Sequence, residues 1–64
     1  MRENELWTRL SRALGDGYAR TWAEQYVLAD LHGRTVVQAL DDGVDCKSIW
    51  RAVWAVLELP LRDR

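Results

Sequence analysis

The sequence has little of what metal binding and catalysis need, since it contains one cysteine, Cys46, and one histidine, His32. A lone cysteine forms no disulfide within the chain, so the fold does not depend on an oxidising compartment. A metal site needs at least three ligands, and a catalytic triad needs an imidazole beside a nucleophile and an orienting group. The sequence therefore predicts no metal and no cofactor, and we expect a protein that is not an enzyme.

Long apolar runs and glycine-rich stretches are absent as well. No run approaches the roughly 18 apolar residues of a membrane span. Residues 1–5, three of which are charged, lead into no apolar region of the signal type. The four glycines stand apart from one another, so none belongs to a phosphate-binding loop. We therefore expect a cytoplasmic protein with no membrane partner.

Neither sign of charge dominates, because nine Lys and Arg oppose ten Asp and Glu for a net charge of −1. A protein that binds phosphate backbones is typically basic, so this balance disfavours nucleic acid as the partner. All cations except Lys47 are nevertheless arginines, which suit bidentate contacts with phosphate. A local arginine patch within a neutral total remains an open alternative.

Apolar residues make up 48% of the 64 residues and include four Trp and two Tyr. A chain of this length buries only about 60% of the surface that its unfolded form exposes, so large apolar side chains are needed for a core. These residues suffice for one small helical domain over residues 1–64. They leave no volume for an enclosed active-site cavity.

Glycines separate four segments in which apolar residues recur at helical spacing. The spacing predicts helices over residues 3–14, 17–31, 35–42 and 46–58. Apolar side chains cover nearly half the circumference of the last helix, so we expect it at the centre of a small all-α bundle. Thr35 and Gln38 predict a capping box, and Asp16 and Asp45 predict N-caps.

The last two predicted helices partly match a helix-turn-helix unit over residues 35–57. Ala39 and Gly43 fall at the positions of the small residue and of the turn glycine. Gln38 and Asp42 occupy positions that the motif makes apolar, and two helices joined by a glycine turn are common in small bundles. A structural role is therefore favoured over DNA binding. The alternative assigns nucleic-acid contact to three cations, Arg34, Lys47 and Arg51.

Aromatic residues recur along one side of the second predicted helix, at Tyr18, Trp22 and Tyr26. Aliphatic residues cover most of its other side, and a helix that is apolar nearly all round lies within a core or uses one side for a partner. Aromatic stripes are usually core, but Tyr and Trp are also preferred interface anchors. Both interpretations stay open, and Trp54, at the margin of the last helix's apolar arc, is a fourth candidate for partner contact.

Several short segments together resemble a known family. They are Gly33-Arg34-Thr35-Val36, Ala39-Leu40-x-x-Gly43 and Lys47-x-Ile49-Trp50-Arg51-Ala52-Val53, with Trp7, Gly15, Tyr18-Ala19, Val27-Leu28 and Pro60. Over essentially the whole chain the sequence is similar to a family of short actinobacterial proteins of unknown function, DUF3046. The chain departs from the pattern that the resemblance implies at two positions. We expect family members to have Pro more often where this chain has Cys46, and often Cys where it has Trp54. The first departure weakens any role for Cys46. Members are often encoded beside the bacterial recombinase and its regulator, which implies a link to DNA repair by association.

Together these features favour a non-catalytic protein-interaction module, an adaptor that binds another protein or a second copy of itself. The candidate contacts are Tyr18, Trp22, Tyr26 and Trp54. The alternative is a small nucleic-acid-associated protein linked to DNA repair or recombination. Exposed apolar surface would favour the first hypothesis, and arginines clustered on one face would favour the second.

Overall fold

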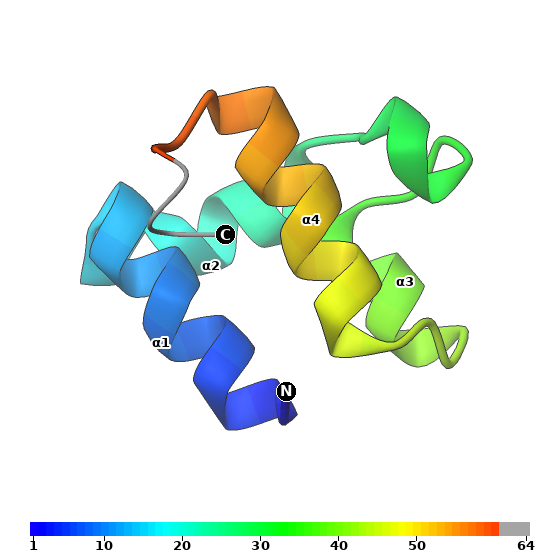
Figure 1. Ribbon diagram of the computed structural model, residues 1–64, viewed down its shortest axis with the longest axis horizontal. Helices are drawn as coiled ribbons and strands as arrows, with labels where there is room; N and C mark the ends of the chain where they lie inside the picture. The colour runs from blue at the N-terminus through cyan, green and yellow to red at the C-terminus, as the bar shows by residue number, and fades with distance from the viewer. Residues whose placement is uncertain (61–64) are drawn as a thin grey trace.

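Four α-helices and one short 3-10 helix form the computed structural model, which describes residues 1–60 (Figure 1). The elements are α1 (Glu3–Leu14), α2 (Asp16–Gln25), η1 (Ala29–Leu31), α3 (Val36–Asp41) and α4 (Cys46–Leu57). The described part of the chain has no strand, only an isolated bridge between Leu28 and Arg34. The predicted all-α fold is confirmed, and the first, third and fourth helices begin and end within one residue of their predicted bounds. None of the helices in residues 1–60 is long and apolar enough to cross a bilayer.

A single residue, Gly15, joins α1 to α2. Its φ of 92° lies in a region that L side chains rarely adopt, and its N–H donates to Ser11 O at 2.7 Å. Gly15 itself is the residue that precedes α2, so the predicted N-cap at Asp16 was wrong. Asp16 already lies in the first turn of α2, where its carboxylate is near the positive end of the helix dipole.

The second predicted helix, residues 17–31, is shorter than its apolar spacing indicated. α2 ends at Gln25, and the backbone is extended at Tyr26 and Leu28. The Leu28 N–H donates to Arg34 O at 3.0 Å instead of to a carbonyl four residues earlier. The prediction was wrong beyond Gln25 because apolar spacing shows which residues are buried and not which backbone geometry buries them.

The chain reverses direction after η1. His32 and Gly33 have φ of 59° and 76°, and the Gly33 N–H donates to Leu28 O at 3.1 Å. Two left-handed residues in succession end η1 and turn the chain back toward α3. Leu28 and Leu31, which had suggested a continuing helix, are both buried. They reach the core from an extended segment and from η1.

The predicted capping box at the start of α3 is present. The Gln38 N–H donates to Thr35 Oγ1 at 3.1 Å, and the Thr35 N–H donates to Gln38 Oε1 at 3.0 Å. Thr35 is also the one buried polar residue among those described. Because α3 has only six residues, these two bonds satisfy a large share of its free backbone groups.

α4 begins at the predicted N-cap, Asp45. The Ser48 hydroxyl donates to Asp45 Oδ1 at 2.7 Å, and the Ser48 N–H donates to Asp45 Oδ2 at 3.1 Å. The hydroxyl bond, followed by the backbone bond, lowers the pKa of Asp45. α4 packs against α1, α3 and η1, which agrees with the central position expected for the last helix.

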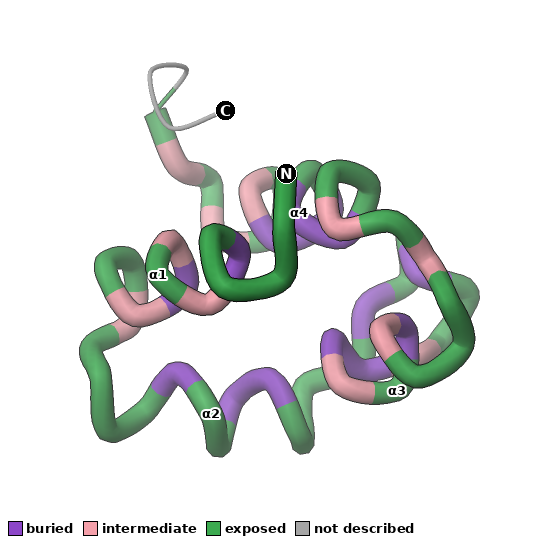
Figure 2. The backbone as a smooth tube through the Cα atoms, turned by 90° about the horizontal axis from the view of Figure 1, so that it is seen from below, coloured by how far each residue is buried: buried purple, intermediate pink, exposed green. Residues whose placement is uncertain are grey.

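All four helices and η1 contribute to one core, and Figure 2 shows the buried positions of the helices turned toward a common interior. The buried apolar residues are Leu6, Leu10, Ala19, Trp22, Ala23, Leu28, Leu31, Val36, Ala39, Ile49, Trp50, Ala52 and Val53. Among the described residues, every buried side-chain nitrogen and oxygen has a hydrogen-bond partner. Formation of this core therefore leaves no buried polar side-chain atom of the described residues unsatisfied.

Loss of the Thr35 hydroxyl should destabilise the protein through α3. We expect Thr35→Ala to lower the free energy of unfolding by about 1 kcal/mol, the usual cost of removing an N-cap side chain. Urea denaturation followed by circular dichroism measures the difference. Thr35→Ser, which keeps the hydroxyl, is the control and should retain most of the stability. Equal losses in the two variants would show that the methyl group, and not the cap, matters at this position.

The Asp45 cap should make stability depend on pH. Because the folded-state pKa of Asp45 is lowered, its contribution is present above the unfolded-state pKa of about 3.9 and is lost as pH falls through the folded-state value. We therefore expect wild type to exceed Asp45→Asn in stability at about pH 6, and the difference to shrink by about pH 2. Urea midpoints at both pH values test this. A difference independent of pH would mean that the ionised carboxylate adds nothing.

Candidate functional site

The aromatic stripe of α2 is divided between the core and the surface. Trp22 is 6% exposed, whereas Tyr18 and Tyr26 are 55% and 44% exposed. The Trp22 and Tyr26 rings stack, with centroids 5.0 Å apart and planes at 15°. Tyr26 thus lies flat over a buried indole, and Tyr18 lies one turn before that indole on the same helix. We call these three residues, of which Tyr26 is the first after the helix, the aromatic surface of α2.

Trp54, the fourth predicted contact, lies on α4 and is half-buried. Its indole Nε1 donates to Pro60 O at 2.9 Å, and its ring packs against the core. The structure therefore ties Trp54 to the segment that follows α4. Trp22 and Tyr26 are brought into contact, and Trp54 belongs to a different helix with different neighbours.

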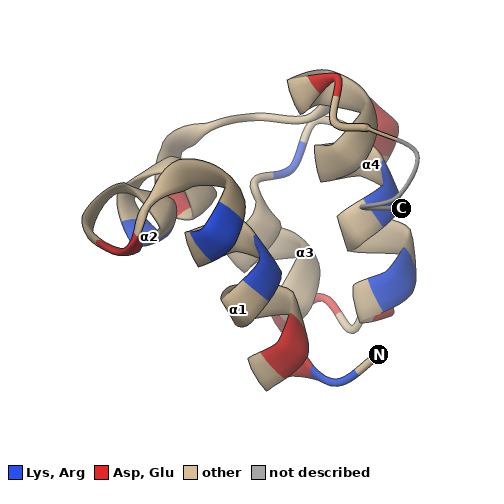
Figure 3. Cartoon of the chain, turned by 60° about the vertical axis from the view of Figure 1, so that its left-hand side comes forward, with Lys and Arg blue, Asp and Glu red and all other residues tan. Residues whose placement is uncertain are grey.

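The three cations of the nucleic-acid alternative have different surroundings. Arg34 Nε lies 2.6 Å from Asp42 Oδ2, and Arg34 Nη1 donates to Leu31 O at 3.3 Å. Lys47 and Arg51 are exposed on α4. Figure 3 shows basic residues on α1 and α4, with acidic residues near the ends of the same helices. Acidic residues therefore lie near the ends of the two helices that carry these cations, and Arg34 is neutralised locally.

Two further arginines lie over indole rings. The Arg9 guanidinium carbon is 5.6 Å from the Trp50 ring centroid, and that of Arg20 is 5.1 Å from the Trp7 centroid. Each arginine also pairs with a glutamate one turn away. These cation–π contacts link α1 to α4 and α2 to α1. Arg9 and Arg20 are therefore both held by contacts within the protein.

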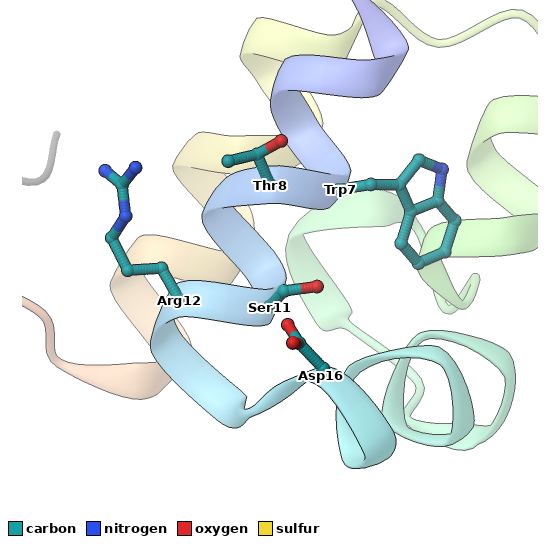
Figure 4. A pocket seen from close by; sticks show the side chains of 5 residues that line it. All are labelled: Trp7, Thr8, Ser11, Arg12 and Asp16. Carbon is teal, nitrogen blue, oxygen red and sulfur yellow. The ribbon is translucent and has the colours of Figure 1, made fainter.

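A shallow hollow lies between α1 and the start of α2 (Figure 4). It is lined by Trp7, Thr8, Ser11, Arg12 and Asp16. Ser11 and Asp16 point toward each other, whereas Trp7 and Arg12 extend to opposite sides. The Thr8 hydroxyl donates to a backbone carbonyl of α1. The five side chains do not converge on a common point, as the groups of a reaction centre must.

Cys46 and His32 lie at the ends of different elements. Cys46 is the half-buried first residue of α4, and His32 is the exposed C-cap of η1. Within residues 1–60, no three side chains from His, Cys, Asp and Glu come together in a way that could hold a metal ion.

Sequence reasoning missed a second apolar surface, the η1–α4 hollow. It is lined by Leu28, Ala29, Asp30, Ala52, Ala55 and Val56 and has a volume of about 200 Å³. Small-molecule pockets have volumes of roughly 300–1,000 Å³, so this hollow suits an apolar side chain better than a whole ligand. It was missed because residues 26–31 were placed within a helix, and because alanines are common in any helix and signal no surface.

These features define a small all-α domain with an aromatic surface on one helix and an apolar hollow beside another. The chain belongs to the DUF3046 family, because the family profile, described as a protein of unknown function, matches residues 1–62. The resemblance found in the sequence is thereby confirmed. No curated protein and no solved structure matches the chain.

The different burial of the aromatic residues predicts different effects of their removal. We expect Trp22→Ala to cost about 3–5 kcal/mol of unfolding free energy, because it leaves a cavity in a small core. Tyr18→Ala, at an exposed position, should change that energy by less than about 0.5 kcal/mol. Thermal denaturation followed by circular dichroism compares them. A cooperative transition near the wild-type temperature in Trp22→Ala would contradict a core role for this indole.

Proposed function

We propose that this protein is a non-catalytic interaction module that binds another protein through the aromatic surface of α2. The observation that carries the proposal is the high exposure of Tyr18 on α2 and of Tyr26 directly after it, while Trp22 between them is buried. A domain of 64 residues needs its large apolar side chains for its core. Two tyrosines left at the surface, one on α2 and one directly after it, are therefore available to a partner.

The geometry of Tyr26 favours binding. Its ring is held by stacking on Trp22, so little side-chain freedom remains to be lost when a partner covers it. Tyrosine also combines a broad apolar face with a hydroxyl that hydrogen-bonds at the edge of an interface. Thr21 and Gln25 are exposed on the same side of α2 and supply a polar rim.

The nucleic-acid alternative draws less support from the residues assigned to it. Arg34 is paired with Asp42, and the exposed Lys47 and Arg51 share α4 with acidic residues at its ends. A balanced net charge also points to protein as the partner. We propose a cytoplasmic location, since a chain with a single cysteine does not depend on an oxidising compartment.

Affinity capture from native lysate tests this function. We expect proteins captured by wild type to persist after nuclease treatment and to be lost, by about tenfold or more, with the double variant Tyr18→Ala/Tyr26→Ala. Arg12→Ala, which shortens an exposed side chain on α1, is the matched control and should capture as wild type does. Circular dichroism confirms that all three proteins are folded.

A different pattern would contradict the proposal. If capture disappears on nuclease treatment and the tyrosine variant behaves as wild type does, the partner is nucleic acid or is held by it. The tyrosines would then be surface residues without a binding role, and Lys47 and Arg51 would be the next positions to replace.

A further inference from the structure

A hollow of about 340 Å³ lies between α1 and α3 and combines apolar with acidic residues. Its half-buried residues, Trp7, Val37 and Leu40, pack against the core and form an apolar floor. Glu3 lies one turn before Trp7 on α1, and Asp41 lies one turn after Val37 on α3. Each helix therefore brings one exposed carboxylate to the edge of the floor, and we call this surface the α1–α3 hollow.

Neither carboxylate is neutralised by the described part of the chain. Within residues 1–60, Glu3 and Asp41 take part in no salt bridge and no side-chain hydrogen bond, whereas the neighbouring Asp42 pairs with Arg34. Asp41 is also the last residue of α3, where the negative end of the helix dipole disfavours a further negative charge. Figure 3 shows acidic residues at the start of α1 and at the end of α3. A cation bound between them would relieve this repulsion.

Arg20 also lines the hollow but is engaged elsewhere. Its guanidinium carbon lies 5.1 Å from the centroid of Trp7, and its Nε pairs with Glu24 Oε2 at 3.3 Å. Because Glu24 offsets the charge of Arg20, the two unpaired carboxylates leave the hollow with an excess of negative charge. Two carboxylates are too few for a metal site. The surface is therefore complementary to an organic cation that has an apolar stem.

We propose that the α1–α3 hollow binds an arginine side chain of a partner protein. The methylene stem packs on the apolar floor, and the guanidinium donates to the carboxylates of Glu3 and Asp41. Arginine suits two separate carboxylates because its five N–H donors are spread over a rigid plane, whereas lysine carries a compact charge. The proposal goes beyond the interaction function, because none of these residues belongs to the aromatic surface of α2.

The capped tripeptide acetyl-Gly-Arg-Gly-amide is the probe that tests this site. The indole N–H signal of Trp7, assigned by its absence in Trp7→Phe, reports on binding in two-dimensional ¹H–¹⁵N NMR spectra. We expect a saturable shift at low salt with a Kd of about 1–10 mM, as is usual for a single side chain. The same tripeptide with citrulline, which keeps the shape of arginine and lacks its charge, should bind about tenfold more weakly.

Replacement of the carboxylates by amides tests their role directly. Glu3→Gln and Asp41→Asn should each weaken binding of the arginine tripeptide by about threefold, and the double variant by about tenfold. Asp30→Asn, at an exposed acid on η1, makes the same change in net charge and is the matched control, so it should bind as wild type does. Tyr18→Ala/Tyr26→Ala should also bind as wild type does.

The charge of Asp41 should contribute nothing to stability. Because its carboxylate is unpaired within residues 1–60 and lies at the negative end of α3, we expect Asp41→Asn to melt at a temperature no lower than wild type. Thermal denaturation followed by circular dichroism measures this and shows that the variant is folded. A lower melting temperature would mean that the protein itself uses this carboxylate, which contradicts a site kept for a partner.

Two results of the titrations overturn the site. One is equal binding of the arginine and citrulline tripeptides, or no saturable shift with either. The other is an equal loss of binding in Asp30→Asn and Asp41→Asn, which would trace the attraction to net charge alone. Since the lysate experiment depends on the tyrosines and the titrations use a peptide alone, failure of this site and failure of the interaction function are observed separately.

Discussion

The chain reversal between α2 and α3 is the constraint on which most of this structure depends. The Leu28 N–H bonds to Arg34 O, and the Gly33 N–H bonds back to Leu28 O, while His32 and Gly33 take left-handed backbone. These bonds replace those that a longer α2 would have made. With these bonds in place, Leu28 is buried beside α4, and the chain leads directly into Thr35, the N-cap of α3.

The reversal also decides which surfaces remain open. η1 packs against α4, and Val56 remains 43% exposed although it shares a side of the helix with the buried Ile49 and Val53. Tyr26, the first residue after α2, lies over Trp22 at the surface. The end of α2 thus lies next to Tyr26, and the reversal that follows it supplies Leu28, Ala29 and Asp30 to the η1–α4 hollow.

A small core also accounts for how the charged residues are used. Because the core is too small to enclose every large ring, Arg9 covers the indole of Trp50 and Arg20 covers that of Trp7. A guanidinium over a ring shields apolar surface and keeps its charge in water. Arg9 and Arg20 therefore cover the edge of the core. A count of cations along the sequence does not distinguish this role from that of a phosphate-binding patch.

The sequence by itself determined the features that depend on neighbours within one helical turn. The bounds of α1, α3 and α4, the capping box of Thr35 and the Asp45 cap all followed from residues three or four positions apart, and membership of the family followed from short motifs. The tertiary structure alone decided where α2 ends, that Trp22 is buried while Tyr18 and Tyr26 are exposed, and that a hollow lies beside α4. The physical reason is that exposure depends on what packs opposite a residue. Periodicity along a helix shows which residues share a side, and only contacts between distant segments show whether that side is covered.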